Sequence, residues 1–348
     1  MRGTPGIVAL LVLGLVVAGC AGNESTAPTN APIAEPSGYA EADAIPAEIR
    51  EQIGDVERGL LDSFESGDPS VLRGLLAAPV LAEIESGPGL APMFESLRRR
   101  LTGSGTERYY DLYLTEVPGD DEPVRITSST QPAFVLEFQA PGNESYVALR
   151  GVVAGIRTMM LGVIYGRDGG TDDWRIYNLR LGQLKVSYRD AMNWYSEATG
   201  LEGQGRLLPA MMRLQIASEL LHPAPFFRYV DEQKILDLQD RVATQLESGT
   251  SFPLEIPDLP GSPRVLAFEP AFLEAVVSIH VNYVTGGPLE QTAIDAEVAR
   301  LRERLSAQFE GLCFGVKRIA FTAFREAPTD AGRQYESIDA LADCPAES

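Results

Sequence analysis

The side chains best suited to chemistry are few in this sequence. Three cysteines, Cys20, Cys313 and Cys344, and two histidines, His222 and His280, are spread over 348 residues. Neither histidine lies at metal-ligand spacing from the other or from a cysteine, which argues against a zinc site. The sequence also holds no Walker-type phosphate loop, no Gly-x-Gly-x-x-Gly after a predicted strand and no Gly-x-Ser-x-Gly elbow. We therefore predict no catalytic residue, no metal and no cofactor.

The carboxylates are numerous but carry little information. Paired acids hydrolyse glycosides in many enzymes, but 49 Asp and Glu residues produce such pairs by chance, so a carboxylate-based hydrolase is the weakest alternative. Asp168, Asp172 and Asp173 cluster in a predicted turn, and their order lacks the EF-hand pattern of a calcium loop. With 29 Lys and Arg, the net charge is −20. This charge argues against nucleic acid as a partner and against electrostatic attachment to an anionic membrane.

The N-terminus has the three regions of a secretory signal. Arg2 precedes an apolar run from Ile7 to Val17, shorter than the ~20 residues that a membrane-spanning helix needs. Small residues then lead to a cysteine in the tetrapeptide Val17-Ala18-Gly19-Cys20. This tetrapeptide resembles the lipobox of bacterial lipoprotein signals, so residues 1–19 are interpreted as a lipoprotein signal peptide. An ordinary signal peptide with a chance cysteine is the alternative.

The lipoprotein resemblance implies a diacylglyceryl thioether on Cys20 and, in many bacteria, an acyl chain such as palmitate on its new amino group. Two or three acyl chains hold a protein on a membrane in an effectively permanent way. Ala21 follows the cysteine, where the inner-membrane retention signal of that family usually has Asp. We therefore expect a lipid-anchored protein of the cell envelope, on the periplasmic face of the outer membrane if the host has two membranes.

The other two cysteines, Cys313 and Cys344, would then lie in a compartment that permits disulfides. We predict that they pair, with two separate free thiols as the alternative. In the chain-entropy account, closing a loop of about thirty residues stabilises a fold by roughly 3–4 kcal/mol.

Composition and periodicity divide the mature chain. Residues 20–45 are rich in Ala, Pro, Ser, Thr, Asn and Glu, which predicts a disordered tether. Within 46–187, helical spacing comes first, with Asp68-Pro69 opening a second helix that Pro79 should kink or end early, and alternating strands follow. This order of elements, with the Trp-led strand in Asp172-Asp173-Trp174-Arg175-Ile176, resembles the cone-shaped nuclear-transport-factor-like (cystatin-like) fold. Enzymes of that group place Asp, His or Tyr inside the cone, and this segment has no histidine.

Residues 188–249 predict a helical hairpin and a third helix. The spacing of Trp194, Ala198 and their apolar neighbours resembles one tetratricopeptide unit, although Glu197 replaces the usual leucine and Pro223 comes one residue late. One unit cannot build a peptide-binding superhelix, so a packing role is favoured over peptide recognition. Residues 250–348 predict a helix packed on a small antiparallel sheet, a second α+β domain.

The expected fold class is therefore α+β: a cone-like N-terminal domain with curved antiparallel sheets, a central helical hairpin and a small C-terminal α+β domain. Phe226, Phe227 and Tyr229 follow two prolines and predict an interdomain contact, with an exposed patch for a partner as the alternative. We expect a non-catalytic interaction or scaffold module with an envelope protein as partner. The alternatives are a periplasm-facing binder of a small apolar ligand, which needs a pocket of at least ~300 Å³ in the cone, and the hydrolase.

Overall fold

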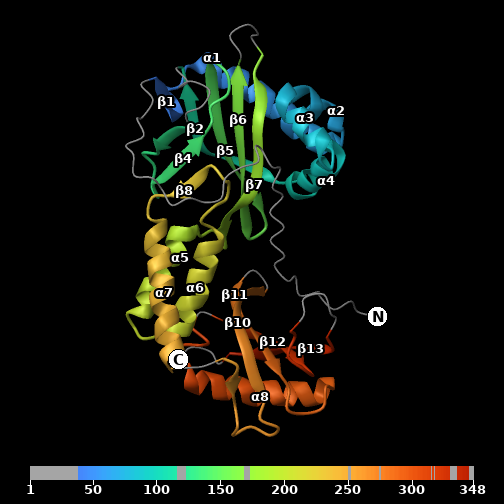
Figure 1. Cartoon of the computed structure of the whole chain (residues 1–348), viewed down its shortest axis with the longest axis vertical. Coiled ribbons are helices and arrows are strands. Elements are labelled where there is room, and N and C mark those ends of the chain that lie inside the picture. Colours follow the sequence, from blue (N-terminus) through green and yellow to red (C-terminus); the bar gives the residue numbers. More distant parts are fainter. Residues whose placement is uncertain are drawn as a thin grey trace. The chain divides into compact units, whose positions relative to one another are not determined.

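The computed structural model describes residues 38–115, 123–167, 173–249, 252–273, 276–314, 316, 318–329 and 335–344. Helices and mostly antiparallel sheets make an α+β protein, as the sequence predicts (Figure 1). The chain forms two compact units. The first comprises the described residues up to 126 together with 136–154 and 159–182, and the second comprises 127–135, 155–158 and the described residues from 183 on.

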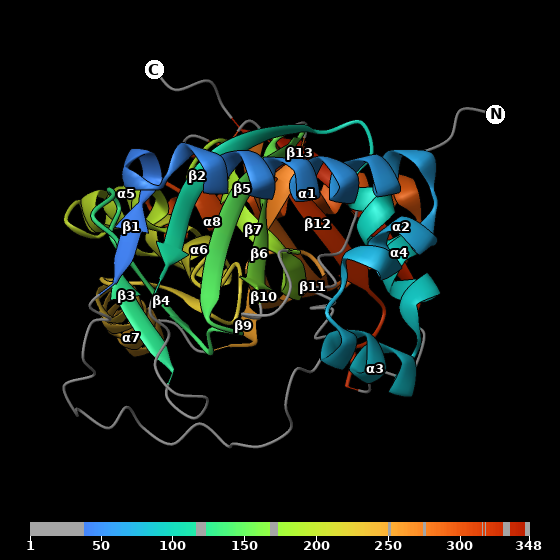
Figure 2. The same ribbon diagram turned by 90° about the horizontal axis from the view of Figure 1, so that it is seen from above.

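The first unit combines a five-stranded sheet with four helices. The helices are α1 (Ala47–Ser66), α2 (Pro69–Leu75), α3 (Ala78–Ser86) and α4 (Leu90–Leu101). The sheet has the order β1-β2-β5-β6-β7, built from β1 (Tyr39–Glu41), β2 (Gly105–Leu114), β5 (Glu144–Ala154), β6 (Arg157–Arg167) and β7 (Arg175–Val186). Helix α1 runs across one face of this sheet, and α2–α4 lie beside its β6–β7 end (Figure 2).

The ordered part of this unit begins earlier than the sequence predicts. Residues 20–45 were expected to be a tether, but β1 pairs antiparallel with β2, and Tyr39 lies opposite Leu114. Ile45 is 1% exposed and belongs to the core beneath α1. A three-residue edge strand has too few apolar residues to show a period, so its pairing is decided by the neighbouring strand. Residues 20–37 lie outside the described residues.

Local sequence signals determine where the helices of the first unit begin and end. The Asp68 carboxylate accepts a hydrogen bond from the Ser70 N–H, and Pro69 occupies the first turn of α2. Helix α2 ends at Leu75, and Pro79 stands in the first turn of α3, which confirms that this proline separates two helices. The periodic apolar faces of α1 and α4 meet in the core, where they bury a large apolar surface.

The second unit contains the predicted helical segment, with α5 (Ala191–Glu202), α6 (Leu207–Glu219) and α7 (Glu232–Gly249). Asp190 and Asn193 form a capping box at the start of α5. Glu197, the departure from the tetratricopeptide spacing, accepts a hydrogen bond from Nε of Arg213 at 3.2 Å. The Arg213 side chain is 3% exposed, so the charge at position 197 compensates a buried cation between the two helices.

A second five-stranded sheet follows, with the order β13-β12-β11-β10-β9. Its strands are β9 (Leu254–Glu255), β10 (Arg264–Leu273), β11 (Val276–Val284), β12 (Arg318–Phe324) and β13 (Ser337–Asp343), and α8 (Gln291–Gln308) lies between β11 and β12 in the chain. The expectation of a wholly antiparallel sheet is wrong here, because β11 and β12 are parallel. The helix between them acts as the crossover that a parallel pair requires.

A short sheet with the order β3-β4-β8 completes the fold, from β3 (Val124–Thr127), β4 (Phe134–Phe138) and β8 (Phe227–Tyr229). Within the described ranges, every helix is too short or too polar to cross a membrane.

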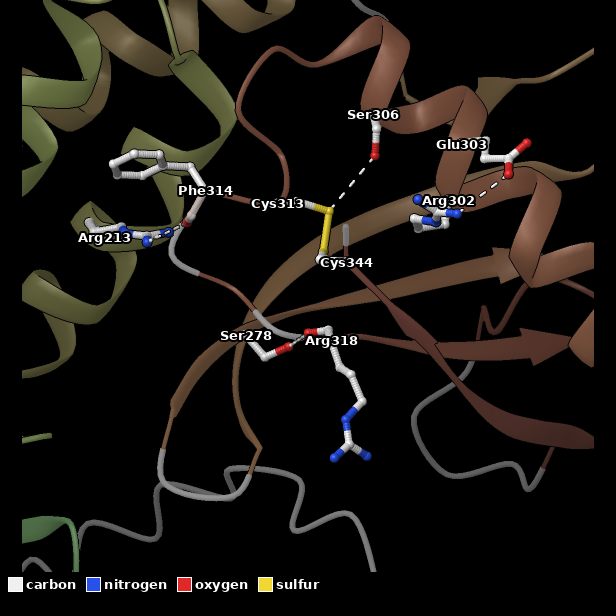
Figure 3. Close-up of a disulfide and its surroundings, with 9 residues drawn as sticks. All are labelled: Arg213, Ser278, Arg302, Glu303, Ser306, Cys313, Phe314, Arg318 and Cys344. Atoms are coloured by element: carbon white, nitrogen blue, oxygen red, sulfur yellow. Dashed lines mark hydrogen bonds and ion pairs between the residues drawn. A yellow bond between two sulfur atoms is a disulfide. The ribbon is translucent and has the colours of Figure 1, made fainter. Parts of the chain in front are cut away.

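Cys313 and Cys344 form a disulfide, the pairing that the sequence predicts (Figure 3). Their Cα atoms are 5.6 Å apart and their sequence separation is 31 residues. Cys313 follows α8 and Cys344 follows β13, and both pack against the core of the second sheet. The bond therefore ties the end of the helix to the edge strand that closes the sheet.

Replacing both cysteines, Cys313→Ser with Cys344→Ser, should lower the free energy of unfolding by about 3–4 kcal/mol, because the unfolded chain regains the entropy of the open loop. Urea unfolding of the chain from residue 20 on measures this loss. A reductant should destabilise the wild-type protein to the same extent and leave the double variant unchanged. Equal urea midpoints for wild type and variant would show that the disulfide does not stabilise the fold.

Candidate functional site

Three charged side chains meet between α1 and the sheet of the first unit. Arg150 on β5 contacts Asp111 on β2, with 2.6 Å between Nη1 and Oδ1, and Glu57 on α1, with 2.8 Å between Nη2 and Oε1. The exposed fractions of these side chains are 14% for Arg150, 3% for Asp111 and 19% for Glu57. We call these three residues the Arg150 cluster.

Two tyrosines pack around the Arg150 cluster. The rings of Tyr146 and Tyr165 meet edge to face with 6.4 Å between their centroids. Burial raises the pKa of both hydroxyls above their ordinary range, and the nearby carboxylates raise it further. The Tyr165 Oη is buried and has no hydrogen-bond partner among the described residues. Both phenols are therefore neutral at physiological pH.

The charged groups of the Arg150 cluster are paired with one another. Burial raises the pKa of Glu57, and its attraction to Arg150 offsets only part of that rise. Burial lowers the pKa of Arg150, but Glu57 and Asp111 outweigh it, so the pKa of Arg150 lies above its ordinary value. The Arg150 guanidinium thus engages both carboxylates, and Asp111 also pairs with Arg108 at 3.2 Å. This arrangement stabilises the packing of α1 on the sheet.

A second polar group lies near one end of α1. Gln52 accepts a hydrogen bond from the Trp174 Nε1–H at 3.0 Å, and the guanidinium of Arg167 lies 5.0 Å from the Trp174 ring centroid. Glu144 accepts a hydrogen bond from Tyr113 Oη at 2.9 Å and pairs with Arg167. Burial, and then Glu144, raises the pKa of Tyr113 to about 12. The tryptophan that the sequence singled out therefore anchors the start of β7 to α1.

A small cleft lies between helix α3 and strand β7 and is called the α3–β7 cleft below. Its volume is about 40 Å³. Two of its lining residues carry a buried polar atom without a hydrogen-bond partner among the described residues, Oδ1 of Asn178 and Nε of Arg180. The lining residues are Leu76, Val80, Glu83, Ile84, Met93, Tyr177, Asn178, Leu179 and Arg180. This cleft is large enough for a few water molecules or one small side chain.

The predicted aromatic residues are core residues. Phe226, Phe227 and Tyr229 are 5%, 0% and 1% exposed. Phe227 stacks on Phe134 with 4.6 Å between ring centroids, and both residues belong to the second unit. The alternative of an exposed patch for a partner is therefore wrong, because all three side chains are buried, Phe227 and Tyr229 on strand β8 and Phe226 directly before it. Two prolines and a cluster of aromatic residues do not by themselves distinguish a buried strand from a surface loop.

Each histidine pairs with neighbouring side chains. His222 lies 3.8 Å from the Glu232 carboxylate. His280 shares a 2.8 Å hydrogen bond with the hydroxyl of Thr322, which in turn donates to Asp339 at 2.6 Å. Burial lowers the pKa of His280 below its ordinary value, although Glu269 and Asp339 act in the opposite direction. His280 is therefore neutral at pH 7 and part of a structural hydrogen-bond chain across three strands.

The remaining predicted residues fall into two groups. Cys20, Asp168 and Asp172 lie outside the described residues, whereas Asp173 pairs with Arg175. No three His, Cys, Asp or Glu side chains within the described ranges are grouped closely enough to hold a metal ion.

Sequence reasoning missed the Arg150 cluster and the α3–β7 cleft. The signal in the sequence was a single arginine ending the apolar stretch Tyr146–Leu149 inside a strand.

Comparisons with known proteins returned nothing: the chain matches no family model, no curated protein and no solved structure.

The substitution Arg150→Met should lower the free energy of unfolding by about 3–5 kcal/mol, because the partly buried Glu57 loses its cation and the buried Asp111 keeps only Arg108, 3.2 Å away. Urea unfolding of the mature chain measures this loss. Adding Asp111→Leu and Glu57→Leu to the same chain should restore part of the stability, since apolar groups replace the uncompensated charges. Arg58→Met on the exposed side of α1 is the matched control and should shift stability by less than about 0.5 kcal/mol. Equal effects of Arg150→Met and Arg58→Met would contradict the structural role.

The chain has only two histidines, so NMR can follow both imidazoles. We expect His280 to titrate below its ordinary pKa of 6.5 because it is buried. Between the two pKa values the unfolded state binds the proton and the folded state does not, so stability falls as the pH decreases through 6.5. His280→Gln should flatten this dependence, whereas His222→Gln assigns the other signal. A His280 pKa at or above 6.5 would refute the burial argument.

Proposed function

We propose that this chain is a lipid-anchored protein of the bacterial cell envelope whose folded part is a non-catalytic interaction or scaffold module. Cys20 is the proposed lipidation site, and the following residues are the proposed spacer between membrane and fold. The proposal places the protein on the periplasmic face of the outer membrane where the host has two membranes. It requires no metal or other cofactor.

The module proposal rests on one observation: the face of the first sheet beneath α1 is filled by side chains that pack against one another. Apolar side chains from α1 and α4 fill this face, with Ile53, Phe64 and Phe94 each 1% exposed. Its ionisable groups bind one another in the Arg150 cluster. These side chains contribute to packing, which supports a function that lies on the surface of the unit.

The two alternatives have less support. A site for a small apolar ligand needs at least ~300 Å³, and the α3–β7 cleft measures about 40 Å³. A carboxylate hydrolase needs two acids that face a common cleft. Asp111 and Glu57 instead share the guanidinium of Arg150.

Membrane fractionation of a bacterial host that makes the full chain tests the anchor. The substitution Cys20→Ser removes the only thiol that can receive the lipid, so the protein should move from the membrane pellet to the soluble fraction. Ala21→Ser, which keeps the cysteine, is the matched control and should stay in the pellet. Ala21→Asp should move the protein from the outer to the inner membrane in a host with two membranes. Membrane attachment of the Cys20→Ser variant would overturn the lipoprotein proposal.

The module part of the proposal is tested by cross-linking on intact cells, with the anchored chain as bait. A non-catalytic module predicts a discrete cross-linked band containing one envelope protein in a fixed ratio. The Cys20→Ser variant should lose this band, because it no longer shares the membrane with the partner. A bait that yields only unmodified monomer in the anchored form would contradict the module.

A further inference from the structure

Strand β7 is the last strand of the first sheet, so one of its edges has no neighbouring strand in that sheet. The Ile176 carbonyl accepts a hydrogen bond from the Ala77 N–H at 2.9 Å. This carbonyl therefore points away from β6. Backbone groups of alternate residues point to the same edge of a strand, so those of Asn178, Arg180 and Gly182 also point outward. A segment that lies along this edge would meet their N–H and C=O groups.

The α3–β7 cleft lies along this open edge. Four consecutive β7 residues, Tyr177 to Arg180, contribute to its lining. Successive side chains of a strand point to opposite faces, so a cleft lined by four in a row follows the edge of the strand. The other wall consists of α3 with Leu76 and Met93. Leu76 forms an isolated parallel bridge with Ile176, which shows that this edge accepts an extended segment at one end.

Two residues that line this cleft each carry a buried polar atom without a hydrogen-bond partner in the described part of the chain. The types of these two atoms define the groups that a ligand would have to supply. Nε of Arg180 is a donor, and Oδ1 of Asn178 is an acceptor; both are buried and have no hydrogen-bond partner among the described residues. Burial lowers the pKa of Arg180, and its attraction to Glu83 offsets only part of that cost. Because both atoms are shielded from solvent, their side chains must shift for a ligand to reach them; a ligand with an anion for Arg180 and an N–H donor for Asn178 would then satisfy both. A peptide with an acidic side chain carries both groups.

The charges on β7 also favour an acidic peptide as the ligand. At neutral pH the charged side chains of β7 are all basic (Arg175, Arg180 and Lys185), in a chain with a net charge of −20. Arg175 already pairs with Asp173, and Glu83 is the acidic residue in the lining of the cleft. Basic residues on an edge strand also discourage pairing between copies of the same sheet. A second copy of this chain would bring the same basic strand to the edge, whereas an acidic segment would complement it.

We propose that β7 binds an extended acidic peptide segment of a partner protein by strand addition, with the peptide backbone paired to the outward edge of β7. A peptide carboxylate binds Arg180, and a peptide N–H donates to Asn178. A small apolar side chain of the peptide enters the α3–β7 cleft. This inference rests on the proposed interaction module and names its docking site. The main-chain pairing supplies affinity, and the cleft and Arg180 supply specificity.

The test uses the mature chain with Cys20→Ser and a panel of fluorescent peptides that alternate valine with glutamate or threonine. Fluorescence anisotropy measures their binding. Each peptide has a twin that is N-methylated at alternate amides, which removes the donors needed for strand pairing and keeps the side chains. Alternate amides of an extended peptide point to opposite edges, so only one pattern of N-methylation blocks pairing with β7. We expect the twins with that pattern to bind about tenfold more weakly or not at all. Equal binding of both forms would overturn strand addition.

Protein variants locate the site. Arg180→Glu should weaken binding of the acidic peptides by about tenfold and should favour a peptide with lysine in place of glutamate. Arg100→Glu makes the same change of charge at an exposed position on α4, and its binding should match the wild type. Gly182→Pro removes an outward N–H that the peptide backbone would pair with, so peptide binding should weaken. Proline is tolerated at such an edge position, so the fold should be kept. Unchanged binding in Arg180→Glu, or no binding of any peptide at millimolar concentration, would refute the site.

Two further outcomes separate this inference from the proposed function. If no peptide binds but the anchored chain still cross-links to one envelope protein, the module stands and the β7 site is wrong. If the chain dimerises and Arg180→Glu abolishes the dimer, the edge binds a second copy, which contradicts an acidic partner.

Discussion

The guanidinium of Arg150 links helix α1 to two strands of the first sheet. It joins Asp111 on β2, its own strand β5 and Glu57 on α1, three segments that are distant in the sequence. A buried cation of this kind is costly unless all its partners are in place, because each unpaired charge would remain in an apolar core. The cluster therefore links the packing of the helix to the register of the two strands.

Local signals in the sequence predicted much of the fold. The Asp68-Pro69 cap and the separation of two helices at Pro79 follow from backbone chemistry that acts over a few residues. The disulfide followed from the cysteine count and the expected compartment. Strand β1 and the parallel pairing of β11 with β12 did not follow, because both depend on which distant strands become neighbours. The lipid anchor and the nuclear-transport-factor-like and tetratricopeptide-like resemblances stay predictions.

The candidate site was harder to predict than the fold. Arg150 appears in the sequence as one charge in an apolar strand, and only the folded chain brings Asp111 and Glu57 to it. Glu197 is the same case: it looked like a departure from a helical repeat, and it compensates the buried Arg213. In both units, a polar residue at an apolar position belongs to a buried ion pair. Phe227 illustrates the opposite error, since a loop-like sequence with prolines forms a buried strand.

With the core of the first unit devoted to packing, we propose the open edge of β7 as the place where its backbone meets another chain. Amide hydrogen exchange along β7 in the mature chain, followed by NMR, tests this most directly. Exchange should alternate along the strand: fast at Asn178, Arg180 and Gly182, whose amides are expected to point outward, and slow at Tyr177 and Leu179, whose amides are expected to face β6. Slow exchange at all of these positions would show that the edge is already covered and would contradict the account.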